Sequence, residues 1–188
     1  IINARAAALA ELETLAAAIH RDLTGGTDGL RLAYHPAYDP AAAPEGQLGL
    51  PLEVPVHRVG LAPSEVQAGL RQRLRETRGE EVARDEIRFL ANGIDLGTYG
   101  SRGQARTAVL ALKLAEVDWM RTKSGEWPIL LLDEVLAELD TNRRRELLAR
   151  LGSAEQCLLT TTDLALFPAE FVQRATVWEV AEGRIIER

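Results

Sequence analysis

The chain has 188 residues, of which 46% are hydrophobic and 27% charged, so it can bury a core and wholesale disorder is excluded. Its formal net charge is −6, so the overall charge does not indicate a nucleic-acid binder. The single cysteine, Cys157, excludes a disulfide framework and a cysteine-based zinc site, and no apolar run approaches the ~20 residues of a membrane span, so we expect a cytoplasmic protein.

The first part of the chain is predicted to hold two helices separated by a loop-rich stretch. Ala, Leu and Glu dominate residues 3–23, and Thr24-Gly25-Gly26 ends this helix. Most of the prolines lie between 29 and 63, which predicts loops around a short strand at 30–34. A second helix is expected to begin at Ser64, where Ser64-Glu65-Val66-Gln67 fits a capping box.

The second helix carries a stripe of arginines, Arg71, Arg75 and Arg78. Such a stripe is typical of a solvated helix face. The alternative is that these side chains contact DNA phosphates.

From residue 85 onward, strands and helices alternate. Residues 87–90 and 94–96 flank Asn92-Gly93, which supplies the positive φ angles of a tight hairpin turn. The later elements are predicted as a helix at 104–121, a strand at 129–132, a helix at 142–151, a strand at 156–160 and a final pair of strands at 176–180 and 184–187. The alternation predicts an α/β fold with parallel central strands.

Two acidic residues follow a strongly apolar strand. Four aliphatic residues at 129–132 are typical of a strand buried on both faces, and Asp133 and Glu134 come directly after them. Open α/β sheets bind ligands at the carboxyl ends of their strands, and two adjacent carboxylates favour a cation partner. This is the layout of a Walker B strand, in which Asp133 would hold Mg²⁺ through water and Glu134 would orient or deprotonate the attacking water. The alternative is a solvated acidic turn.

A segment with serine and glycine precedes the long helix. Ser101-Arg102-Gly103-Gln104 lies where a helix N-terminus offers free N–H groups and the positive end of its dipole. Ser101 can donate its hydroxyl, and Gly103 lets a phosphate approach the backbone. The alternative is an ordinary N-cap in a glycine-containing loop.

Two further polar segments follow the apolar strand. Leu139-Asp140 precedes a helix that carries Arg143, Arg144 and Arg145, and the strand at 156–160 leads into Thr161-Thr162-Asp163. Cations are mildly unfavourable at the beginning of a helix. The three arginines therefore either belong to a solvated turn or contact DNA phosphates or a partner subunit.

The order of these segments is more specific than any one of them. Together they resemble the C-terminal half of an ABC-type ATPase head, and residues 99–116 and 130–140 resemble the RecF family of bacterial DNA replication and repair ATPases. The resemblance implies that Ser101-Arg102-Gly103-Gln104 is the ABC signature, Asp140 the D-loop residue and Thr162 the residue at the switch position. It divides the chain into a mainly helical second domain at 1–84 and the C-terminal part of the ATPase domain at 85–188.

The same resemblance implies ATP and Mg²⁺ as cofactors and an ATP-dependent homodimer. In this family the signature of one head reaches the nucleotide held by the other, so Ser101 and Gly103 would grip the opposite γ-phosphate and Asp140 would lie at the dimer seam. The implied partners are DNA at single-strand gaps, RecR, RecO and RecA, whose loading such a protein promotes.

One departure from the family pattern is the absence of a Gly-Lys pair, and with it of the Walker A motif. In RecF-like proteins that motif lies in an N-terminal half, so we expect a C-terminal fragment that cannot hydrolyse ATP by itself. One alternative is an SMC/Rad50-like head fragment, although 3–23 and 64–80 are too short for its coiled coils. Another is a non-catalytic DNA- or protein-binding module with ABC shape, against which the intact acid pair argues.

Overall fold

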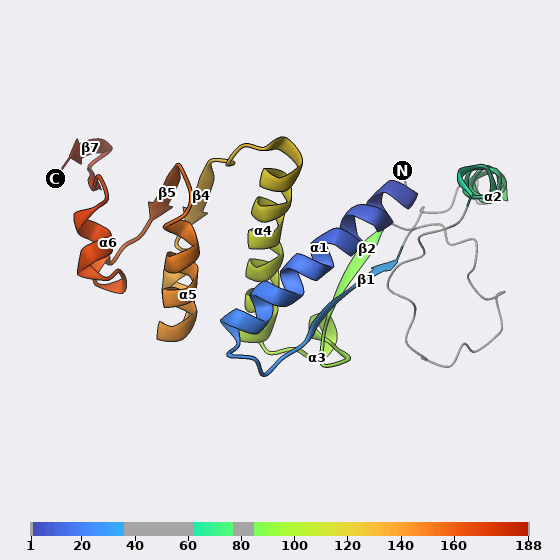
Figure 1. Cartoon of the computed structure of the whole chain (residues 1–188), viewed down its shortest axis with the longest axis horizontal. Coiled ribbons are helices and arrows are strands. Elements are labelled where there is room, and N and C mark those ends of the chain that lie inside the picture. Colours follow the sequence, from blue (N-terminus) through green and yellow to red (C-terminus); the bar gives the residue numbers. More distant parts are fainter. Residues whose placement is uncertain (1, 36–61, 77–84, 188) are drawn as a thin grey trace. The chain divides into compact units, whose positions relative to one another are not determined.

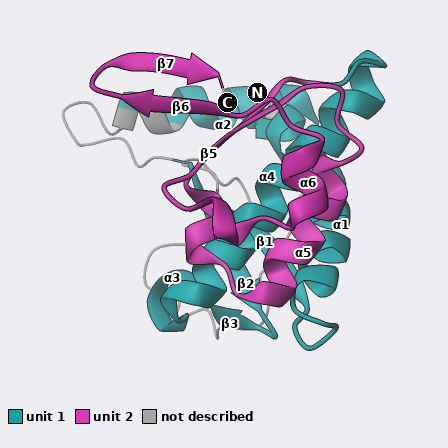
Figure 2. Ribbon diagram, turned by 90° about the vertical axis from the view of Figure 1, so that its left-hand side faces the viewer, with its two compact units in different colours: residues 1–127 teal, residues 128–188 magenta. Residues whose placement is uncertain are grey.

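The computed structural model describes residues 2–35, 62–76 and 85–187, and its elements are drawn in Figure 1. The chain divides into two compact units, Ile1–Trp127 and Pro128–Arg188 (Figure 2). None of the helices among the described residues combines the length and apolarity that crossing a bilayer requires.

The first unit is built around two helices, α1 (Ile2–Leu23) and α4 (Arg102–Ser124), which pack on each other. Small side chains lie on the buried faces of both helices, since Ala16 of α1 and Ala108, Ala111 and Ala115 of α4 are all 0% exposed. At the rim, Glu11 accepts hydrogen bonds from the Trp119 indole and the Lys123 ammonium, both at 2.8 Å. These two contacts, Lys123 first, lower the pKa of Glu11.

An antiparallel sheet completes the first unit. Strand β1 (Leu30–His35) pairs with β2 (Glu86–Ala91), which continues through a turn into β3 (Ile94–Asp95). Asn92 has φ 51° and Gly93 φ 80°, so the predicted hairpin turn is confirmed. The predicted boundary between residues 84 and 85 falls between two strands that pair, and the division into family domains stays a prediction.

Helix α2 (Pro63–Glu76) begins one residue before the predicted start. The Ala62 carbonyl already accepts from the Val66 N–H at 3.3 Å, so Ser64 lies inside the first turn and the predicted capping box there is wrong. Pro63 instead takes the first helical position, where its fixed φ suits the helix and its missing N–H costs nothing.

The second unit contains the parallel pair that the sequence predicts. Strand β4 (Leu130–Asp133) runs parallel to β5 (Cys157–Thr160), with Leu130 opposite Cys157 and Asp133 opposite Thr160. The 3₁₀ helix η1 (Val135–Glu138) and helix α5 (Thr141–Leu151) connect the two strands. The other elements are η2 (Leu164–Leu166), α6 (Ala169–Gln173) and the hairpin of β6 (Trp178–Ala181) and β7 (Arg184–Glu187).

The prediction that the apolar strand is buried on both faces is wrong for the described residues. Leu130 is 8% exposed, but Ile129 and Leu131 are 61% and 75% exposed. Side chains alternate between the two faces of a strand, and within the described part of the chain β4 pairs with β5 alone. One face therefore turns toward the leucine core of this unit, which comprises Leu130, Leu136, Leu139, Leu147, Leu148 and Leu151, while the other stays open.

Candidate functional site

The two acids after β4 lie at the carboxyl end of the parallel pair, as expected. Asp133 is the last residue of β4 and Glu134 is the first residue beyond it. Glu134 adopts φ 53°, ψ 14°, a left-handed conformation that costs a non-glycine residue roughly 1–2 kcal/mol. A residue keeps such a conformation only where surrounding contacts hold it, and residues of this kind are common at functional sites.

A residue of the neighbouring strand holds the acid pair. The Thr160 hydroxyl donates to Asp133 Oδ1 at 2.5 Å and accepts from the Glu134 N–H at 3.1 Å. Sequence reasoning missed Thr160 and singled out Thr162, which lies two residues past the end of β5 with an exposed side chain. The parallel register that places Thr160 opposite Asp133 is the signal that could have found it.

The oxygen atoms at this edge fit Mg²⁺ better than a transition metal. Among residues 2–35, 62–76 and 85–187, no three His, Cys, Asp or Glu side chains gather closely enough to hold a metal ion by themselves. Mg²⁺ usually takes one or two carboxylates and fills its other positions with water and substrate phosphates. Asp133, which accepts a hydrogen bond from Thr160, fits that pattern, and a nucleotide and water would supply the remaining ligands.

The Ser101 segment forms the N-terminus of α4. Ser101 is the N-cap, its hydroxyl oxygen accepts the Gln104 N–H at 3.2 Å, and the Gln104 side chain accepts the Ser101 N–H at 2.9 Å. Ser101 and Gln104 thus form a capping box, so the N-cap that the sequence offers as the alternative for this segment is present. Ser101 keeps its hydroxyl hydrogen for an acceptor outside the helix, and the N–H groups of Arg102 and Gly103 point out of the first turn.

Two glycines flank this N-terminus, and the fold requires only the first. A Cβ added to Gly100 would lie 2.5 Å from the Leu96 carbonyl oxygen, far inside van der Waals contact. A Cβ added to Gly103 would lie 4.0 Å from Ser101 Oγ, an ordinary contact. The fold therefore tolerates a side chain at Gly103, and the bare backbone there is available to a ligand.

Asp140 has a structural role at the beginning of α5. It is the N-cap, accepts the Arg143 N–H at 3.0 Å and pairs with the Arg143 guanidinium at 3.1 Å. Arg144 Nε donates to the Leu136 carbonyl at 2.9 Å, which ties α5 to η1. Arg145 is exposed and contacts Asn142 Oδ1 at 3.4 Å. Of the three arginines, Arg145 is therefore the least engaged within the chain.

The other arginines proposed to contact DNA lie on α2. Arg71 and Arg75 are both exposed on this helix, one turn apart. Arg78 lies outside the described residues. Contact of these side chains with DNA stays a prediction.

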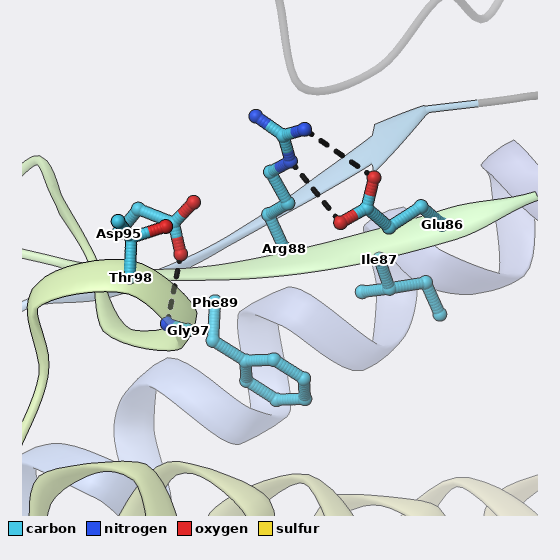
Figure 3. A pocket seen from close by; sticks show the side chains of 7 residues that line it. All are labelled: Glu86, Ile87, Arg88, Phe89, Asp95, Gly97 and Thr98. Carbon is cyan, nitrogen blue, oxygen red and sulfur yellow. Dashed lines mark hydrogen bonds and ion pairs between the residues drawn. The ribbon is translucent and has the colours of Figure 1, made fainter.

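A pocket of about 320 Å³ lies in the first unit, lined by residues of β2, β3 and the short helix α3 (Leu96–Tyr99) (Figure 3). Its one cation, Arg88, already pairs with Glu86 through two hydrogen bonds of 3.3 Å, and Asp95 accepts from the Gly97 N–H at 2.8 Å. With two acids and a neutralised arginine, this pocket does not suit an anionic nucleotide.

Comparison with known proteins identifies the family of the chain. No protein-family model matches it. It is 38% identical over 190 residues to the DNA replication and repair protein RecF of Chloroflexus aurantiacus and 37% identical over 181 residues to that of Bacillus subtilis, matching 98% and 95% of this chain. It spans 45% and 46% of those relatives, about half their length.

Solved structures agree with the sequence relatives. Two structures of "the recombination mediator protein RecF" in the RecFOR pathway, one with ATP and one described as RecF-ATPrS, match the whole chain with a TM-score of 0.69 and 25% identity. The match covers 46% of each solved chain. This chain is therefore a RecF-family sequence that corresponds to the C-terminal portion of its relatives.

Proposed function

We propose that this chain supplies the signature and Walker B parts of an ATP-dependent DNA replication and repair protein. The observation that carries the proposal is the acid pair at the carboxyl end of β4, where Asp133 is tied to β5 and Glu134 is held at φ 53°. RecF relatives and RecF structures that hold ATP support the choice of nucleotide.

The chemistry is hydrolysis of ATP to ADP and phosphate. Asp133 would hold Mg²⁺, which when bound neutralises charge on the phosphate oxygens. Glu134 orients the attacking water and accepts its proton as the oxygen approaches the γ-phosphorus. Thr162 would add at most a hydrogen bond to the γ-phosphate or the water, since a threonine hydroxyl does not shuttle protons as an imidazole does.

The N-terminus of α4 would act on a second nucleotide. The Ser101 hydroxyl and the N–H groups of Arg102 and Gly103 donate to the γ-phosphate held by the opposite subunit, and Gln104 keeps Ser101 in place. Asp140 would lie at the dimer seam. ATP would then close a homodimer on DNA at single-strand gaps, and hydrolysis would open it.

The same proposal includes the wider pathway. RecR, RecO and RecA would be the protein partners in the cytoplasm, with RecA loading as the outcome. The structures named above place RecF in the RecFOR pathway, which supports this choice.

The proposal is tested in the full-length polypeptide, meaning this chain together with the N-terminal half that its relatives carry. Glu134→Gln should trap an ATP-bound dimer, because water binds but its proton has no acceptor, and Ser101→Arg should abolish ATP-dependent dimerisation while single-site ATP binding persists. Light scattering with and without ATP, and phosphate release, measure both effects.

Matched controls are available on the same elements. Glu182→Gln removes an equivalent charge from another glutamate at positive φ (48°), in the β6–β7 turn, and Ser124→Arg places the same cation at the other end of α4. Both controls should behave as wild type. Wild-type turnover of Glu134→Gln would rule out Glu134 as the base, and normal dimerisation of Ser101→Arg would rule out the signature assignment.

A further inference from the structure

The last residue of β5 is hydrogen-bonded to both acids of the proposed site. Thr160 lies opposite Asp133 in the parallel register, and its hydroxyl contacts Asp133 Oδ1 at 2.5 Å and the Glu134 N–H at 3.1 Å. A single side-chain oxygen, Thr160 Oγ1, therefore links β5 to the carboxyl end of β4, where the two acids lie.

The direction of these two bonds is fixed. Since Thr160 Oγ1 accepts the Glu134 N–H, its own hydrogen is directed at Asp133. A hydroxyl bound to a carboxylate makes a strong, charge-assisted hydrogen bond. The bond restricts rotation of the Asp133 carboxylate and so also fixes the position of its other oxygen, Oδ2.

The second bond acts on the backbone of Glu134. This residue has φ 53°, which a glutamate adopts only when its surroundings hold it there. The N–H to Thr160 and the carbonyl, which accepts from the Ala137 N–H at 3.2 Å, fix the peptide groups on both sides of its Cα. The direction in which the Glu134 side chain leaves the chain thus depends on Thr160.

The neighbouring threonine has a different role. The Thr161 hydroxyl accepts the Asp163 N–H and donates to the Asp163 carbonyl, both at 3.1 Å, and so closes a local turn. Thr161 and Thr160 therefore have equally many hydrogen bonds but different targets, which makes Thr161 a matched control.

We infer that Thr160 is a positioning residue for ATP hydrolysis, whose hydroxyl orients Asp133 toward the metal and holds Glu134 in its left-handed conformation. The inference rests on the proposed function. It assigns to β5 a contribution that is separate from Thr162 and that acts only through the two acids.

The test compares three variants of the full-length polypeptide. Thr160→Val removes the hydroxyl and keeps the shape, Thr160→Ser keeps the hydroxyl, and Thr161→Val is the control. Loss of a group that orients a metal ligand commonly costs 10–100-fold. We expect Thr160→Val to lower kcat about 10–100-fold and to weaken Mn²⁺ binding in the presence of ATP, measured by electron paramagnetic resonance, by a similar factor.

The other two variants distinguish an effect of the Thr160 hydroxyl from an effect of side-chain shape. Thr160→Ser should recover most of kcat and of the Mn²⁺ affinity, Thr161→Val should match wild type, and ATP affinity should be unchanged throughout. If Thr160→Val does not fold, Thr160→Ala provides the same comparison with a smaller side chain.

Two results would overturn the inference alone: wild-type kcat and Mn²⁺ affinity in Thr160→Val, or a Thr160→Ser variant as impaired as Thr160→Val. In either case Glu134→Gln would still be inactive. If Glu134→Gln turned over ATP normally, the proposed function would fail, and the inference with it, because Thr160 would then have no catalytic group to position.

Discussion

The two glycines at the beginning of α4 allow a direct test of which glycine the fold requires and which glycine phosphate binding requires. The same substitution, glycine to alanine, is made at Gly100 and at Gly103. At Gly100 the new Cβ would lie 2.5 Å from the Leu96 carbonyl oxygen and 2.8 Å from its Cα, both backbone atoms that cannot swing away. At Gly103 it meets nothing closer than 4.0 Å.

The magnitudes follow from these contacts. Forcing a methyl group into occupied space costs about 1–3 kcal/mol, so Gly100→Ala should lower the free energy of unfolding by that amount. Alanine is preferred over glycine by about 1 kcal/mol in a helix interior, and by less in the first turn, so Gly103→Ala should raise stability by about 0.5 kcal/mol. The two variants should therefore differ by about 1.5–3.5 kcal/mol, with opposite signs relative to wild type.

Urea denaturation measures the stabilities, and light scattering with ATP measures dimerisation of the full-length polypeptide. Gly103→Ala should be stable yet impaired in ATP-dependent dimerisation, because the methyl group occupies the space where a phosphate would approach. Destabilisation of Gly103→Ala as severe as that of Gly100→Ala would refute the reasoning about the fold. A stable Gly103→Ala variant that dimerises normally would refute the reasoning about the ligand.

Two further predictions concern ionisable groups of the first unit. Burial, and after it the hydrogen bond from the Tyr34 hydroxyl to Asp85 (2.7 Å), raises the pKa of Tyr34 to about 12. The contribution of the protonated Tyr34 to the free energy of unfolding should therefore be complete below pH 10 and be lost as the pH rises toward 12. Phenolate absorbance should show this titration, and Asp85→Asn should lower its midpoint; an unchanged midpoint would contradict the assignment. The pKa of Glu11 is lowered by Lys123 and Trp119, so its contribution should be present above the usual glutamate pKa and lost as the pH falls below it. Trp119 fluorescence should report this transition and Glu11→Gln should abolish it; a transition that persists in Glu11→Gln would have another source.

The sequence predicts features that depend on neighbours along the chain. Asn92-Gly93 forms a turn with positive φ, because this residue pair adopts that backbone conformation at low cost. The order of the segments around Ser101, Asp133 and Asp140 resembles an ABC-type ATPase head, and the wider strings at 99–116 and 130–140 resemble the RecF family, which the sequence relatives confirm.

Features that depend on neighbours in space were harder to predict. Thr160 was missed because only the register of two strands 27 residues apart brings it to Asp133. The capping-box pattern predicts a helix beginning at Ser64, but a proline at the first helical position also suits a helix beginning, and the residues along the chain do not separate the two. The aliphatic run at 129–132 could not show that one face of β4 would be open, since burial depends on which elements cover the sheet.

The exposed apolar side chains on the strands of the second unit affect how light scattering of this polypeptide has to be measured. Among the described residues, sheets β4–β5 and β6–β7 have two strands each, and Leu131, Val180 and Ile185 are 75%, 73% and 72% exposed. In a two-stranded sheet each strand has an edge without a partner strand, and such edges beside exposed apolar side chains favour pairing with other chains, which leads to aggregation. Such self-association needs no nucleotide and grows with protein concentration, so scattering recorded without ATP is the baseline above which any specific dimer is counted.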